Sequence, residues 1–190
     1  MTGEPHIAVA SYPGGIRVRS AWGGSGDGPA VFALSEAGGS LAELGPLVSP
    51  GYERQCRAEL RIETPGGPWA VRLASPIFDE PSAFLWDEPG LLVVGYGFLS
   101  YAFAARTGEL RWQHRSHTPL VAILGSARIP HVIVQAEIET FAIEPDGEVA
   151  WRIAHSDVVT EAALVGGRLV LTSFAGQLSA LDPRTGRPTG

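Results

Sequence analysis

A turn recurs down this chain at nearly constant spacing, and this repeat constrains the fold more than any other feature. Gly67, Gly108, Gly147 and Gly186 stand about 40 residues apart, each within a similar pattern of strand, turn and strand. Two copies are especially alike and read YAFAARTGELRW and FAIEPDGEVAW. A repeat of this kind is typical of stacked units, because each unit buries its apolar faces only against its neighbours.

The segments between these turns are short apolar runs that predict β-strands. They are rich in Val, Ile, Leu and aromatic residues, and Gly or Pro pairs bound them. Three recognisable repeats span residues 82–190, and residues 1–75 form a divergent first part. We therefore predict a single all-β domain over residues 1–190, a propeller-like stack of about four antiparallel four-stranded blades.

The last repeat stops at its turn, because position 190 is Gly190 where the earlier copies carry tryptophan. An N-terminal strand at 6–11 is expected to supply the missing outer strand and close the stack, since closure removes exposed sheet edges. Two alternatives stay open: two chains complete each other as a homodimer, or the sequence is a fragment of a longer propeller. The Gly, Pro and Ser punctuation of residues 35–55 predicts a long loop.

The turn motifs resemble the tryptophan-docking repeat of the pyrroloquinoline-quinone-like β-propellers over about residues 90–190. In that family an Ala-x-Asp-x-x-Thr-Gly turn precedes a strand that carries tryptophan. The last copy matches this turn in full, and the two earlier copies match in part. The matching residues are Gly108, Trp112, Gly147, Trp151, Ala180, Asp182, Thr185 and Gly186. The resemblance implies blades, with Trp112 and Trp151 packing between them, in a family that includes quinone dehydrogenases, assembly scaffolds and sensors.

Cofactor chemistry is not expected. By the resemblance, full quinoproteins need a calcium site and an adjacent-cysteine disulfide, whereas this chain has one cysteine and no asparagine. The chain also has no lysine, which excludes Schiff-base and P-loop chemistry. A single cysteine allows neither an intrachain disulfide nor a CxxC pair. We therefore predict no cofactor, and a binding protein rather than an enzyme.

The net charge and the hydropathy of the chain limit the classes of partner that it is expected to bind. The formal net charge of −6 argues against nucleic acid, whose binders present basic surfaces to the phosphates. No stretch approaches 18 consecutive apolar residues, and the first residues lack a signal-peptide pattern, so we expect no membrane contact and a cytoplasmic location. The absence of Lys and Asn fits a high-GC bacterial genome.

Histidines are the candidate metal ligands. His114 and His117 form the nearest approach to a ligand pair, although residues three apart on a strand face opposite sides. They reach one ion only if the strand bends at its end. His131 and His155 are further ligands to test.

The segment 76–89 is the candidate partner contact. Phe84, Leu85, Trp86 and Asp87 combine large apolar side chains with Asp-Glu-Pro sequences that are typical of loops. The equally weighted alternative is a blade element that packs on the core.

Two functions follow from these patterns. The leading prediction is a non-catalytic protein-binding module, either an assembly subunit or an immunity-type protein. The alternative is a small-molecule or metal-binding domain, enzymatic in one form, that uses the funnel between blades with His114, His117, Arg111 and Arg115.

Overall fold

The computed structural model describes residues 6–23, 56–77 and 79–189. The chain forms two compact units, one of Met1–Pro81 with Ala105–Glu109 and one of Ser82–Ala104 with Leu110–Gly190. Each unit is described by itself. The loop predicted for residues 35–55 and the tryptophan position at residue 190 lie outside the described residues.

Unit 1 contains one antiparallel sheet, sheet A, in the order β1-β2-β3-β4. Its strands are β1 (His6–Tyr12), β2 (Ile16–Gly23), β3 (Cys56–Glu63) and β4 (Trp69–Ser75). A single 3₁₀ turn at Pro13–Gly15 joins β1 to β2, and its Pro-Gly-Gly sequence suits a tight reversal because two glycines there have positive φ.

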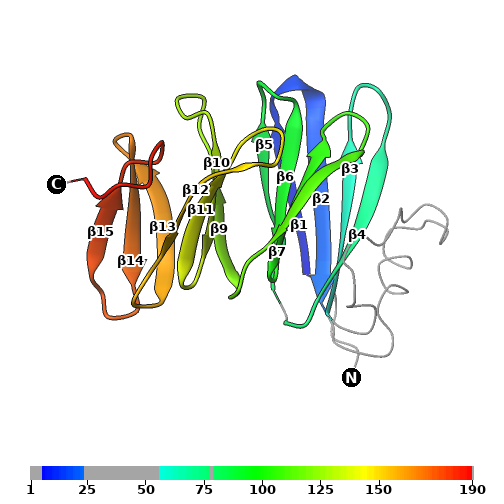
Figure 1. Cartoon of the computed structure of the whole chain (residues 1–190). Coiled ribbons are helices and arrows are strands. Elements are labelled where there is room, and N and C mark those ends of the chain that lie inside the picture. Colours follow the sequence, from blue (N-terminus) through cyan, green and yellow to red (C-terminus); the bar gives the residue numbers. More distant parts are fainter. Residues whose placement is uncertain (1–5, 24–55, 78, 190) are drawn as a thin grey trace. The chain divides into compact units, whose positions relative to one another are not determined.

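Unit 2 contains three antiparallel sheets that follow one another along the chain (Figure 1). Sheet B has β5 (Ser82–Trp86), β6 (Leu91–Tyr96), β7 (Leu99–Ala104) and β8 (Leu110–Arg115). Sheet C has β9 (Leu120–Leu124), β10 (Val132–Ala136), β11 (Glu139–Ile143) and β12 (Val149–Ala154). Sheet D has β13 (Val159–Val165), β14 (Arg168–Ser173) and β15 (Leu178–Leu181). The all-β, propeller-like fold class is confirmed. Whether the two units act as one domain stays a prediction.

Two apolar cores hold the sheets of unit 2 together. The first joins sheets B and C and contains Trp112, Phe141 and Ile143 among its buried members. The second joins sheets C and D through Ile133, Leu169 and other buried aliphatic side chains. Central strands β6, β10 and β11 are buried along their whole length, which explains why their sequences are continuous apolar runs rather than alternating ones.

β1 forms a hairpin with β2 in unit 1, and its completion of the last blade stays a prediction. β1 pairs with β2 over seven consecutive residues, from His6 opposite Trp22 to Tyr12 opposite Ile16. A tight turn joins these two strands and favours the local hairpin. Within the described residues sheet D has three strands, and Leu181 forms an isolated bridge with Pro188.

In unit 2, the repeat tryptophan of one sheet packs on the turn glycine of the next sheet. Trp112 Nε1 donates to Pro145 O at 3.3 Å, and Trp151 Nε1 donates to Pro183 O at 3.2 Å. The glycine of each receiving turn leaves room for the indole. A Cβ on Gly147 would lie 2.8 Å from Trp112, and one on Gly186 would lie 2.6 Å from Trp151.

Unit 1 contains a third docking tryptophan that the sequence repeat does not identify. Trp69 Nε1 donates to Ala105 O at 3.0 Å, and a Cβ on Gly108 would lie 2.6 Å from the indole ring. Gly67, in contrast, has no atom within 4 Å of the position that a Cβ would take, and it serves only the turn between β3 and β4. Trp69 stands two residues after its turn glycine instead of four, which hides it from the repeat pattern.

Asp182 organises the last turn. Its Oδ1 accepts from Arg184 N at 2.9 Å and its Oδ2 accepts from Thr185 Oγ1 at 3.2 Å. The backbone N–H of Gly186 donates to Asp182 O at 2.8 Å. The acidic residue and the Thr-Gly pair of the motif therefore stabilise the turn through hydrogen bonds to one another and to the backbone.

Candidate functional site

The segment predicted to contact a partner forms β5, a strand rather than a loop. β5 pairs with β6 from Ser82 opposite Gly95 to Trp86 opposite Leu91. Trp86 is only 7% exposed and belongs to the core between sheets B and C, against which Phe84 also packs. Trp86 is therefore not the centre of an exposed patch. The contact role of Phe84, Leu85, Trp86 and Asp87 stays a prediction.

His114 lies between sheets B and C. Its Nε2 is 2.6 Å from Gly147 O, so this nitrogen carries the proton and donates. The ring meets Trp112 edge-on at 5.6 Å between centroids and is tilted against Phe141 at 6.3 Å. These contacts make His114 part of the packing that surrounds the docked indole.

His117 has a different partner, the buried carboxylate of Glu139. Glu139 Oε1 accepts from His117 N at 2.8 Å and lies 3.1 Å from His117 Nδ1, while the His117 side chain is largely exposed. Arg152 Nε lies 3.7 Å from Glu139 Oε2, and its guanidinium stands over the Phe141 ring at 5.0 Å. Glu139 thus ties the loop after β8 to sheet C.

The structure therefore gives His114 and His117 separate partners. Within residues 6–23, 56–77 and 79–189 no group of three or more His, Cys, Asp or Glu side chains is placed to hold a metal ion. The metal site at His114 and His117 stays a prediction.

His155, which the sequence analysis named as a ligand to test, belongs to a polar chain in sheet C whose other members, Thr140 and Gln135, have no signal in the sequence. Thr140 Oγ1 donates to Gln135 Oε1 at 2.5 Å and lies 2.6 Å from His155 Nε2, so His155 donates to Thr140. Gln135 Nε2 in turn donates to Ala136 O at 2.6 Å. Burial lowers the pKa of His155 below its usual value of 6.5. The chain satisfies its own polar atoms, which is what a structural network requires.

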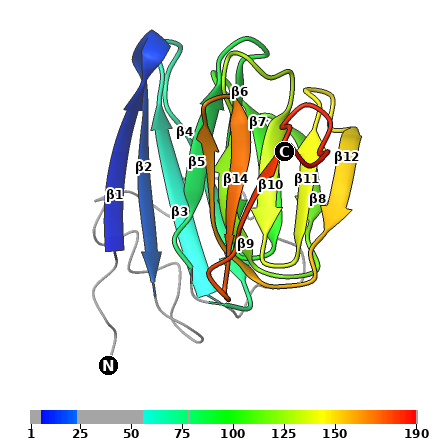
Figure 2. The same cartoon turned by 90° about the vertical axis from the view of Figure 1, so that its left-hand side faces the viewer.

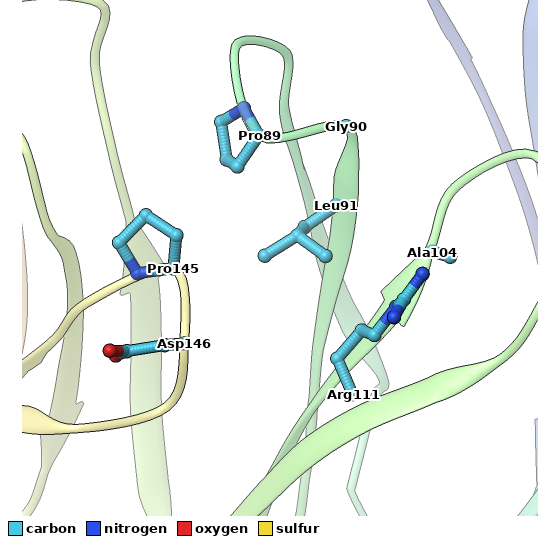
Figure 3. Close-up of a pocket in the computed structure, with 7 residues that line it drawn as sticks. All are labelled: Pro89, Gly90, Leu91, Ala104, Arg111, Pro145 and Asp146. Carbon is cyan, nitrogen blue, oxygen red and sulfur yellow. The ribbon is translucent and has the colours of Figure 1, made fainter.

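A cleft of about 470 Å³ opens between sheets B and C (Figure 3). Figure 3 shows Pro89, Gly90 and Leu91 on one wall, the turn of Pro145 and Asp146 on the other, and Arg111 at the base. Asp146 Oδ1 accepts from Glu148 N at 3.0 Å, so this carboxylate shapes its own turn. Arg111, which the sequence singled out, is the cation of the cleft.

The side of sheet D that faces away from sheet C carries exposed apolar side chains. Figure 2 looks onto this face, with β14 toward the viewer. Leu178 is 73% exposed and Val165 is 59% exposed, and Phe174, just after β14, is 80% exposed. We call this surface the outer face of sheet D.

The part of the chain that the structure describes holds no helix with the length and apolar character needed to cross a bilayer.

Comparisons with known proteins support the family resemblance. Residues 97–189 match the family model described as outer membrane protein assembly factor BamB. A search of curated proteins finds no match to the chain.

Solved structures are similar in fold. The structure of HIRA(644-1017) matches with a TM-score of 0.52 and 12% identity over 100% of this chain and 53% of that one. BamB from Moraxella catarrhalis matches with a TM-score of 0.46 and 24% identity over 57% of this chain and 36% of that one. The Neurospora crassa Pan2 WD40 domain matches with a TM-score of 0.48 and 15% identity, covering 57% and 36%. The chain thus spans about half of the HIRA structure and about a third of BamB.

The docked indoles of unit 2 explain why the family model matches where it does. Each matched turn carries a glycine whose missing Cβ makes room for the tryptophan of the preceding sheet. Residues 97–189 thus carry, in both motif and geometry, the tryptophan-docking repeat of the pyrroloquinoline-quinone-like β-propellers, whose family model they match.

Proposed function

We propose that this chain is a non-catalytic protein-binding module whose partner packs on the outer face of sheet D. The observation that carries the proposal is the exposure of Leu178 and Val165 on the outer side of one small sheet, together with the exposure of Phe174 just after β14. Soluble proteins keep contiguous apolar surface small, and larger patches commonly mark protein contacts. Burying these three side chains against a partner would contribute several kcal/mol, at about 1.5–3 kcal/mol for each fully buried side chain.

The family name supports the same function. The matching model describes an assembly factor, which favours an assembly subunit over an immunity-type protein. Polar groups near the candidate sites, including Gln135 and Asp146, already serve the fold. This occupation of polar groups favours binding over catalysis.

The test is capture of partners from a lysate of the source organism, with the chain as bait and mass spectrometry as readout. Leu178→Asp places a charge on the outer face without touching the core, because Leu178 is largely exposed. Leu110→Asp is the matched control, since Leu110 is also exposed but lies on β8. We expect a stoichiometric protein with the wild type and with Leu110→Asp, and its loss with Leu178→Asp. Equal capture by all three proteins contradicts the proposed site.

A second candidate function, small-molecule binding, is favoured by the cleft at Arg111. A guanidinium beside proline and leucine side chains suits a ligand with a carboxylate or phosphate and an apolar body. A thermal-shift screen of such anions tests it: ligand at about 100 times its Kd stabilises by about 2.7 kcal/mol. Loss of the shift in Arg111→Gln would assign the ligand to this cleft, and no shift with any anion contradicts the candidate.

A further inference from the structure

We propose that the outer face of sheet D docks a second copy of this chain, sheet against sheet, about a two-fold axis. This inference names a partner for the face described above and therefore rests on the proposed function.

Strand register shows how the face is built. Side chains alternate between the two sides of a strand, and Leu169, Leu171 and Leu181 point into the core with sheet C. The intervening residues form three rows across the strands on the outer side. These rows are Glu161, Thr172 and Leu178; then Ala163, Val170 and Ala180; then Val165 and Arg168.

The middle row suits another sheet better than an irregular partner. Ala163, Val170 and Ala180 are apolar and two of them are small, so a flat apolar surface can approach closely. Face-to-face sheets pack about 10 Å apart with apolar side chains interleaved. The inner side of sheet D already packs in this way on sheet C, through Leu169 and Leu171.

The charges at the two ends of the face point to a second copy. Glu161 lies in one end row and Arg168 lies in the other, and both are exposed. A two-fold axis that crosses the strands in the interface plane lays each end row over the opposite end row of the second copy. Glu161 of each copy then stands diagonally opposite Arg168 of the other. Such a pairing is self-complementary, as a two-fold interface must be.

The size of the face sets the strength of the pairing. Three strands about 4.8 Å apart and about six residues long at 3.4 Å per residue cover roughly 300 Å². Stable interfaces bury about 800 Å² on each partner. The dimer is therefore weak and reversible, with a Kd on the order of 100 µM.

Sedimentation equilibrium of the purified chain over about 10 µM to 1 mM, a range that brackets this Kd, tests the proposal. Glu161→Arg and Arg168→Glu each replace two attractive pairs with two repulsive ones, and each is expected to raise the Kd about tenfold. The double reversal restores the pairs and should return the Kd to within about twofold of the wild-type value. Leu178→Asp should abolish dimerisation, and Leu110→Asp should leave it unchanged. Circular dichroism confirms that each variant is folded.

The outcomes separate this inference from the proposed function. A wild-type chain that is monomeric at every concentration overturns the self-pairing. So does a dimer whose Kd stays unchanged in Glu161→Arg or in Arg168→Glu. A monomeric chain that still captures a different protein, and loses it on Leu178→Asp, leaves the protein-binding function standing while the second copy is excluded. A dimer with the reversal and rescue pattern supports the self-pairing and assigns the outer face of sheet D to a second copy.

Discussion

Replacing Gly108 with alanine should destabilise unit 1 because the turn has no room for a side chain. The φ of Gly108 is +74°, a value that L-residues rarely adopt. The added Cβ would lie 2.6 Å from Cδ2 and Cε3 of Trp69, inside the 3.0 Å limit that real Cβ contacts respect. The indole must move, and its Nε1 then loses the 3.0 Å hydrogen bond to Ala105 O.

The expected cost has two parts. Left-handed backbone costs a residue other than glycine about 1–2 kcal/mol. Overpacking against the indole adds about 1–3 kcal/mol. Gly14→Ala is the matched control, because Gly14 has a φ of +76° in the same unit with no atom within 4 Å of its would-be Cβ. It should show the first part alone, so Gly108→Ala should cost more by about 1–3 kcal/mol.

Urea unfolding followed by circular dichroism measures both variants, and a double-mutant cycle isolates the indole. In a Trp69→Ala background the ring atoms are absent, so Gly108→Ala should cost no more than Gly14→Ala. A coupling of about 1–3 kcal/mol between positions 69 and 108 is the predicted result. Equal costs for Gly108→Ala and Gly14→Ala in the wild-type background would refute the docking argument.

Three further predictions concern unit 2. Trp112→Phe removes the N–H that donates to Pro145 O. The lost hydrogen bond should lower the free energy of unfolding in urea by about 0.5–1.5 kcal/mol, in addition to the effect of the smaller ring. Burial lowers the pKa of His155 below 6.5, so the unfolded chain binds the proton more readily than the folded chain. The free energy of unfolding should therefore be highest above pH 6.5 and fall as the pH drops below that value. His155→Gln should flatten this part of the profile of stability against pH. Gly125→Ala should destabilise by about 1–3 kcal/mol, because its Cβ would overlap the ring of Phe84; an unchanged melting temperature would contradict this packing.

Most strands of unit 2 can be predicted because their signals are local. The observed β6, β10 and β11 are short apolar runs of the kind that the sequence analysis expects for strands. A glycine with positive φ marks turns between strands, as at Gly176. Neither signal needs information from distant parts of the chain.

The strand β5 is hidden in the sequence because its flanks are misleading. Proline and Asp-Glu-Pro sequences surround Ser82–Trp86, and these sequences favour turns. Pairing with β6 and burial of Trp86 make the segment a strand. The same tertiary contacts make Phe84 and Trp86, two of the predicted contact residues, part of the packing between sheets.

The polar sites show the same division between local and distant information. The spacing of His114 and His117 marks them in the sequence, but their partners Gly147 and Glu139 lie in another sheet. The chain from Gln135 through Thr140 to His155 leaves no spacing signal, because cross-strand pairing brings its members together.

The amino-acid sequence by itself determined that this chain is a stack of antiparallel repeats with glycine turns, because the repeat, strand alternation and turn chemistry are all written in short stretches. The choice of which tryptophan enters which turn, and the burial of Trp86, depend on the tertiary structure. Those outcomes depend on competition between contacts far apart in the sequence, where loop-closure entropy and the fit of side chains select one partner among several.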